Sequence, residues 1–457
     1  MKIVKMRLAH APFRPLFPFA IALSLALNAW AENVPDEKSP ARYRSSLSEK
    51  GTPSGDGVLE DAYHLYRDVS QDQSDLAHQA LNQAYASNVK VARKSVAALR
   101  ALESAQRLPP LSYLLSVAID VMRYQNGDYE DEDEEKVLIK SIDDATEQGS
   151  YLCKQALEKE PDHPTYLLIL GGIRGFSATL KINGNPSQAM GDGFQALKLL
   201  ERSRARDERI KDSFMGTGIF NCTAANAPLF VRATLKIIGR SVTMKAGLEA
   251  LRISAYQGQY TSVSSQLFLI QFLPPYDKEL IREKREIFSS LEQAYSRNPY
   301  YTFLKTDEAL CFYPDSFYSQ ASRTALAARI TGFSTQDFSS RRYANLVRYQ
   351  YTLLDPTPER RYAPDTAFEF RDYGFYPVFI EALRLKRATE DTLGIDEKPP
   401  KAASVALKEL RDSAIELMRN SPMNPTRKRY YQWHITDALR WTNRGRPAPT
   451  GEPTTSR

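Results

Sequence analysis

The chain has little cysteine, histidine and tryptophan, and each scarcity excludes a class of site. Of its 457 residues only three are Cys, five are His and three are Trp. Three cysteines exclude a disulfide framework and any zinc or iron–sulfur site built from several thiolates. No His-Glu-x-x-His, Gly-x-x-x-x-Gly-Lys-Ser/Thr or Gly-x-Ser-x-Gly sequence occurs. We therefore expect no metal, no cofactor, no catalytic residues and no enzyme activity.

The first 31 residues have basic residues but no acidic ones. Residues 1–14 carry four Lys or Arg, an apolar stretch runs from Leu16 to Leu27, and Ala29-Trp30-Ala31 follows. This order predicts a secretory signal peptide over 1–31 and an exported protein, periplasmic or associated with the cell envelope. An uncleaved anchor remains the alternative. No later run reaches 18 apolar residues, so we expect no integral membrane segment after cleavage.

The charge balance is nearly neutral once this leader is removed. The whole chain has 61 basic and 55 acidic residues, and losing four basic ones leaves 57 against 55, a net charge of +2. So small an excess gives no electrostatic reason to expect nucleic acid as a partner.

Helical periodicity dominates the remainder of the chain. A Ser-, Pro- and Gly-rich linker is predicted over 32–57, helical repeats over 58–316, a C-terminal helical region over 317–444 and a disordered tail over 445–457. Alternating strand patterns are lacking, so the predicted fold class is all-α. The expected helices are 76–108, 111–124, 137–159, 165–181, 187–206, 210–223, 228–239, 243–257, 261–272, 278–297, 299–312, 378–390, 401–420 and 426–443.

Two helix junctions share a spacing of small residues and proline. Ala156 precedes Pro161 by five residues, and Ala294 precedes Pro299 by five. We expect a neighbouring helix to cross at each Ala. A Leu170-Gly171 pair lies in a predicted helix between the two junctions. Together with this pair, the spacing resembles the tetratricopeptide repeat, in the long-helix form of secreted bacterial proteins and mitochondrial outer-membrane clearance proteins. The resemblance implies an α-solenoid that binds other macromolecules and has no catalytic residues.

Several conspicuous residues have ordinary structural interpretations. The acidic run 128–135 lacks the Gly that a calcium loop needs at its sixth position, so it is expected to precede a helix. The pairs Gly191/Gly193 and Gly216/Gly218 lack a strand before them and are expected to let helices approach closely. The three cysteines, at 153, 222 and 311, are expected to be buried small hydrophobic residues rather than a disulfide.

Aromatic residues give the main indication of function. Tyr and Phe supply large contact areas at low entropic cost, and they recur at predicted helix ends and in the stretch 368–376. The candidate partner-binding residues are Tyr256, Tyr260, Tyr300, Tyr301, Phe368, Phe370, Tyr373 and Phe375. We expect a non-catalytic exported scaffold that binds a protein or peptide partner in the cell envelope.

Two alternatives to this scaffold remain open. One is a periplasmic helical small-molecule-binding or transport-accessory protein, with aromatic residues of 368–375 closing a pocket. The other is an α-helical hydrolase, which needs two carboxylates that converge in a cleft. The sequence leaves the partner, the biological process and the oligomeric state undetermined.

Overall fold

The structure is a computed structural model, and every regular element among the residues that it describes is an α-helix. It describes residues 66–125, 131–181, 186–226, 242–273, 278–312, 319–333, 338–354 and 401–419, with a few single residues between them. The all-α prediction is confirmed for these residues. The predicted leader, linker and tail, and the helices expected at 378–390 and 426–443, lie outside the described ranges or almost entirely so.

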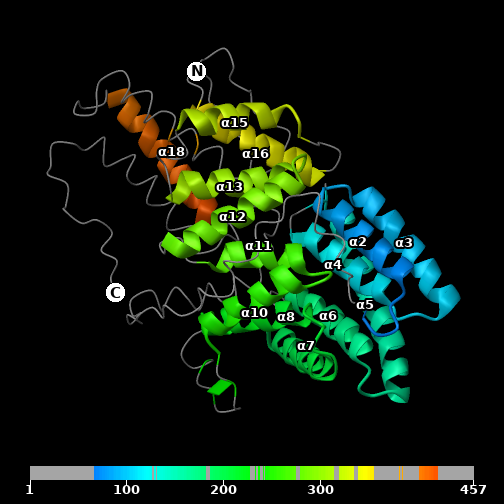
Figure 1. Ribbon diagram of the computed structural model, residues 1–457. Helices are drawn as coiled ribbons and strands as arrows, with labels where there is room; N and C mark the ends of the chain where they lie inside the picture. Colours follow the sequence, from blue (N-terminus) through cyan, green and yellow to red (C-terminus); the bar gives the residue numbers. More distant parts are fainter. Residues whose placement is uncertain are drawn as a thin grey trace.

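The first seven helices pack in sequence order, each against the next (Figure 1). Their bounds are α2 Gln71–Tyr85, α3 Val89–Gln106, α4 Leu111–Gln125, α5 Glu132–Lys159, α6 Pro164–Lys181, α7 Pro186–Arg206 and α8 Ser213–Ala225. Contacts also link helices two apart, such as α4 with α6. This neighbour-to-neighbour packing is what helical hairpins need, because none buries its apolar face alone.

The remaining helices continue from α8 toward the top of the view in Figure 1. Their bounds are α10 Met244–Gln257, α11 Ser262–Phe272, α12 Lys278–Ala294, α13 Pro299–Phe312, α15 Gln320–Ile330, α16 Phe338–Leu354 and α18 Lys401–Arg419. Helices α15 and α16 were not predicted. The aromatic residues Tyr343 and Tyr351 of α16 are buried, so tertiary packing outweighs their modest helix propensity.

The predicted helix 76–108 is wrong, because the chain breaks there into α2 and α3. Ser87 has a φ of 58°, in the left-handed region, and α3 begins directly after Asn88. Short polar side chains compete for backbone hydrogen bonds and favour such breaks. The Ser70 hydroxyl accepts from the Gln73 backbone N–H at 3.2 Å and starts α2, so the polar run 70–74 begins a helix.

The acidic run 128–135 caps a helix, as expected. The Asp131 carboxylate accepts hydrogen bonds from the backbone N–H groups of Asp133 at 3.1 Å and Glu134 at 2.8 Å. These contacts satisfy donors that the first turn of α5 leaves without partners, and negative charge is favourable at that end. The helix thus begins five residues before the predicted start at 137.

Glycine permits close helix approach at one of the two predicted pairs. A Cβ on Gly218 would lie 2.9 Å from the carbonyl oxygen of Gly247, so α8 and α10 cross almost backbone to backbone. At Gly191 and Gly193 a Cβ would meet nothing within 4 Å, so that part of the expectation is wrong. The helix crossing expected at Ala294 is not found among the described residues, because Ala294 is exposed.

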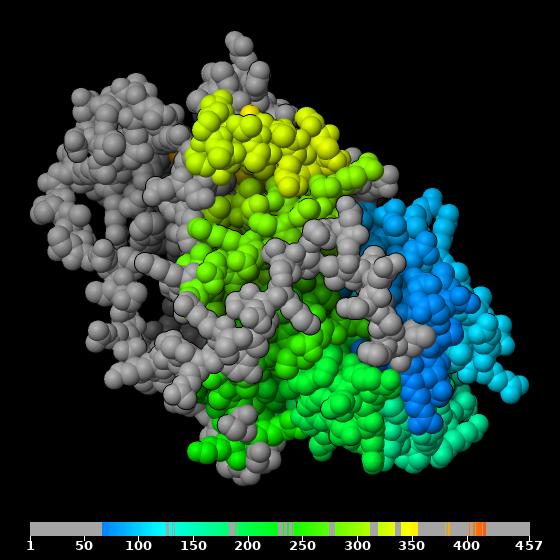
Figure 2. Space-filling model, viewed as in Figure 1, coloured from blue at the N-terminus to red at the C-terminus, as the bar shows by residue number. Residues whose placement is uncertain are grey.

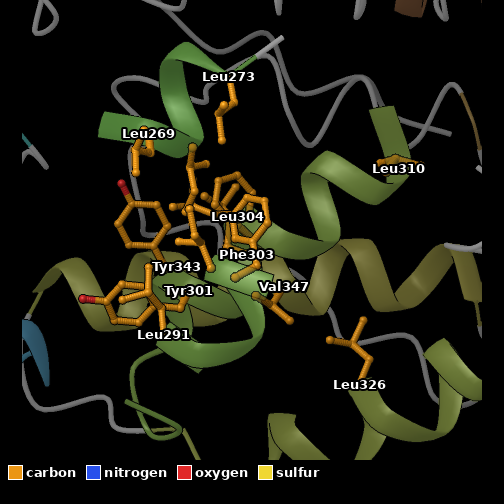
Figure 3. Packing of buried hydrophobic residues seen from close by; sticks show 14 of the residues in the cluster. Leu269, Leu273, Leu291, Tyr301, Phe303, Leu304, Leu310, Leu326, Tyr343 and Val347 are labelled. Atoms are coloured by element: carbon orange, nitrogen blue, oxygen red, sulfur yellow. The ribbon is translucent and has the colours of Figure 1, made fainter. Parts of the chain in front are cut away.

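Buried apolar residues form two large clusters, one for each half of the described chain. The first joins α2–α7 and also includes Tyr260 of the α10–α11 turn, and the second joins α8 with α10–α16. Figure 3 shows the second cluster, in which Phe303 and Leu304 of α13 lie among residues from α11, α12 and α16. Val263 and Tyr295 pack against both clusters and so lie where the two halves meet.

Helix α2 also contacts segments far ahead of it in the chain. The Tyr85 hydroxyl hydrogen-bonds to Ser264 Oγ at 2.5 Å, and the Asn298 side chain donates to the Tyr85 carbonyl at 2.8 Å. His78 Nε2 lies 3.1 Å from the carbonyl oxygen of Gln259. In the space-filling view the blue N-terminal helices accordingly lie directly against green segments from mid-chain (Figure 2). The helical array therefore closes on itself at this edge.

Two further observations on the described residues bear on the sequence predictions. No helix there combines the length and apolar character that crossing a bilayer requires. Cys153 and Cys222 are buried free thiols, as predicted, and burial raises the pKa of each to about 12. A thiol held in its neutral form at neutral pH is a poor nucleophile.

Candidate functional site

Interhelical turns from distant parts of the chain meet at one edge of the helical array and form an open cleft of about 500 Å³. The N-terminal segment, residues 66–70, runs past the α5–α6 turn and the α7–α8 turn. We call this depression the charged cleft. It is lined by Arg67, Glu160, Asp162, Pro164, Arg206, Asp207 and Arg209.

Each arginine of the charged cleft is paired with a carboxylate. The Arg67 guanidinium contacts Glu160 through both Nη atoms, at 2.5 and 3.1 Å. Arg209 donates to Asp207 from Nε at 2.8 Å and from Nη2 at 2.7 Å. Such two-point pairs fix the plane of the guanidinium as well as its position.

A single carboxylate at the cleft, that of Asp162, binds two arginines of α7. Arg202 Nη2 donates to its Oδ1 at 2.8 Å, and Arg206 Nη2 donates to its Oδ2. The two arginines are four residues apart, so they lie on the same face of the helix. The hydrogen bond from Arg202, followed by the charge of Arg206, holds the pKa of Asp162 below its usual range. Asp162 is therefore fully ionised at neutral pH.

Hydrogen-bond donors outnumber acceptors on this surface. A guanidinium offers five N–H groups, yet Arg202 and Arg206 each use only one nitrogen in the described contacts. Arg209 uses Nε and Nη2, which leaves Nη1 unused among the described contacts. The carboxylate oxygens of the cleft already accept hydrogen bonds from arginine. Because the three arginine side chains are 51–57% exposed, their remaining N–H groups are accessible.

The buried carboxylate of Asp212 fastens the turn that carries Arg209. It accepts hydrogen bonds from the backbone N–H groups of Gln259, Tyr260 and Thr261 at 3.2, 2.9 and 2.7 Å. The Thr261 hydroxyl donates to it at 2.6 Å, and the Tyr66 hydroxyl donates to its other oxygen. One side chain therefore joins the N-terminal segment, the start of α8 and the α10–α11 turn.

The N-terminal segment is also held against α6. The Thr165 hydroxyl donates to the Arg67 carbonyl at 2.6 Å, and His163 Nε2 lies 2.7 Å from Asp68 Oδ2. The side chain of His163 is only 3% exposed, whereas that of Asp68 is largely exposed. These contacts fix the backbone of Arg67, so the wall of the charged cleft that Arg67 forms is rigidly placed.

The four predicted partner-binding aromatics that the structure describes are dispersed, and none of these four lines the charged cleft. Tyr260 and Tyr301 are buried, and their rings pack between helices. Tyr300 is half-buried and lies edge-on to Tyr343, with centroids 4.8 Å apart. Tyr256 is 57% exposed on α10. The others, Phe368, Phe370, Tyr373 and Phe375, lie outside the described residues.

Sequence reasoning missed the arginines of the charged cleft. The run 201–211 holds five basic residues within eleven positions, and it spans the end of a predicted helix. The helix dipole favours basic residues in the last turn of any helix, and the run also holds three acidic residues, so the sequence alone did not single out this surface. Within the described residues no three His, Cys, Asp or Glu side chains gather in a way that suits a metal ion.

Comparisons with family models, with curated proteins and with solved structures found no match to this chain.

Proposed function

We propose that this protein is a non-catalytic scaffold of tetratricopeptide-like helical hairpins, exported to the cell envelope, that binds a protein or peptide partner. The leader-like residues 1–31 support export, and the neighbour-to-neighbour packing of α2–α8 supports a solenoid built from hairpins. The partner binds at the charged cleft rather than through Tyr256, Tyr260, Tyr300 and Tyr301, the predicted aromatics that the structure describes.

One observation carries this proposal: exposed arginines with unused donors line an open cleft whose walls are firmly held. Surface ion pairs contribute little to stability, so stability alone gives no strong reason to gather three arginines in this cleft, with Arg202 beside them. Arginine is enriched where proteins bind one another, because its planar group both stacks and hydrogen-bonds. The arginine side chains that line the cleft stay about half exposed, which suits a partner that brings its own surface to cover them.

Affinity capture from an envelope extract tests this function. The mature chain, immobilised beside an Arg206→Glu variant, is expected to retain a defined envelope protein, identified by mass spectrometry, that the variant loses. The matched control is Arg282→Glu, the same charge reversal on α12 at a side chain that is 73% exposed. It should retain the same protein as the unmodified chain.

Three results contradict the proposal. An identical set of proteins on all three samples places binding elsewhere. Retention of only a small molecule, released on denaturation, moves the function to ligand binding. Retention of nothing at low salt removes the scaffold role altogether. The urea midpoint of each variant must match that of the unmodified chain, because an unfolded sample would lose partners trivially.

A further inference from the structure

The charged cleft has chemical features that select among partners, and this deepens the proposed function on which it rests. Its carboxylates are occupied by arginines, while the arginines keep donors. A ligand with acceptor oxygens therefore meets more unused groups in the cleft than a ligand rich in donors does, because the unused guanidinium N–H groups outnumber the lone pairs left on the paired carboxylates. Carboxylate matches the guanidinium fork in two-point geometry, which makes it a preferred acceptor.

The openness of the charged cleft selects for size. A small-molecule site normally buries most of the surface of its ligand. Here the lining residues Arg67, Arg206 and Arg209, and Arg202 beside them, remain 48–57% exposed, so the walls cannot enclose a small dicarboxylate. A peptide segment lying across the surface can contact several of these side chains in succession. We propose that the charged cleft binds an extended acidic peptide segment through the carboxylates of its side chains.

The arrangement of the arginines sets the contacts such a segment makes. Arg202 and Arg206 share one face of α7 and already converge on Asp162. Arg209 follows in the α7–α8 turn. A second carboxylate approaching from solvent bridges the unused nitrogens of the α7 pair, and the next acidic residue along the peptide meets Arg209 Nη1. Each new contact adds to an existing ion pair instead of breaking one.

Fluorescence anisotropy with a labelled peptide of alternating Glu and Ser residues tests this recognition. The unmodified full chain is expected to bind it, with affinity falling as salt rises from about 10 to about 150 mM and the Debye length shrinks from about 30 to about 8 Å. The isosteric peptide with Gln in place of Glu is expected to bind at least tenfold more weakly, about 1.4 kcal/mol. The double variant Arg202→Gln/Arg206→Gln should show a similar loss with the Glu peptide, and Arg282→Gln should show none.

The outcomes separate this inference from the proposed function. Equal binding of the Glu and Gln peptides overturns carboxylate recognition, as does undiminished binding by the double variant. If neither peptide binds yet the envelope partner is still retained in an Arg206-dependent way, the scaffold survives and the acidic-segment inference fails. Preferential binding to anionic phosphatidylglycerol vesicles, lost in the double variant, reassigns the charged cleft to a membrane surface and also overturns the inference.

Discussion

The carboxylate of Glu103 makes stability depend on pH, and its replacement by Gln should remove that dependence. Glu103 lies on α3 and is only 5% exposed. Its Oε1 accepts from Gln73 Nε2 at 3.0 Å and from the Ser112 backbone N–H at 2.8 Å, and the Ser112 hydroxyl donates to Oε2 at 2.5 Å. Burial outweighs these hydrogen bonds and raises the pKa of Glu103 to about 7, from an ordinary 4.5.

The sign and size of the effect follow from that difference. The folded chain binds a proton between pH 4.5 and 7 that the unfolded chain has released, so the free energy of unfolding falls as pH rises through this window. A pKa difference of about 2.5, at 1.36 kcal/mol for each pH unit, amounts to roughly 3 kcal/mol at pH 8. The contribution is intact below pH 4.5 and is lost above pH 7.

Urea unfolding of the Glu103→Gln variant, followed by circular dichroism at several pH values, measures this term. Gln keeps one acceptor oxygen for Gln73 and the Ser112 N–H, and its amide can donate to the Ser112 hydroxyl as a protonated Glu does. The variant should match the unmodified chain near pH 4.5 and exceed its stability by up to about 3 kcal/mol at pH 8. The control Glu286→Gln alters a carboxylate that is 71% exposed and should change nothing. A stability difference that stays constant across pH would refute the reasoning.

Substitutions at three further positions test the packing by the same urea assay. Asp212→Ala removes the acceptor of three backbone N–H groups and should lower the free energy of unfolding by about 3 kcal/mol or more. Asp212→Asn should recover part of this loss. An unchanged urea midpoint in Asp212→Ala would show that water replaces the carboxylate. Gly247→Ala places a Cβ 2.4 Å from Cys222 Sγ and should cost about 1–3 kcal/mol. Gly193→Ala, inside α7 with open space around it, should instead stabilise by about 0.5–1 kcal/mol, and destabilisation there would contradict the assigned packing.

Local sequence patterns predicted most helices because helix boundaries are local events. The expected helix 165–181 is found at Pro164–Lys181, and 401–420 is found at Lys401–Arg419. Proline and short polar residues end helices through their own backbone chemistry, which needs no knowledge of distant segments. The break at Ser87 escaped prediction because apolar periodicity continues through it, since α2 and α3 both bury a face against the same core.

The charged cleft depends on pairings that no local pattern records. Arg67 meets Glu160 across 93 residues of sequence, and Arg202 meets Asp162 across 40. The sequence shows the charges, but their pairing depends on where each interhelical turn ends in space. The aromatic candidates show the reverse case, in which the sequence draws attention to residues that the structure explains by packing. Tyr260 and Tyr301 stand out in the sequence, and both are buried between helices.

The charged cleft and the closure of the helical array have a common structural cause. A row of hairpins packed only on their sequence neighbours would leave the N-terminal segment unattached, and Arg67 would be absent from the site. Asp212 attaches that segment to the α10–α11 turn through Tyr66, and Thr165 holds the Arg67 carbonyl. Loss of the Asp212 carboxylate should therefore weaken acidic-peptide binding even where the helices remain folded. By contrast, a substitution at α12, such as Arg282→Gln, leaves this attachment intact and should leave the affinity unchanged.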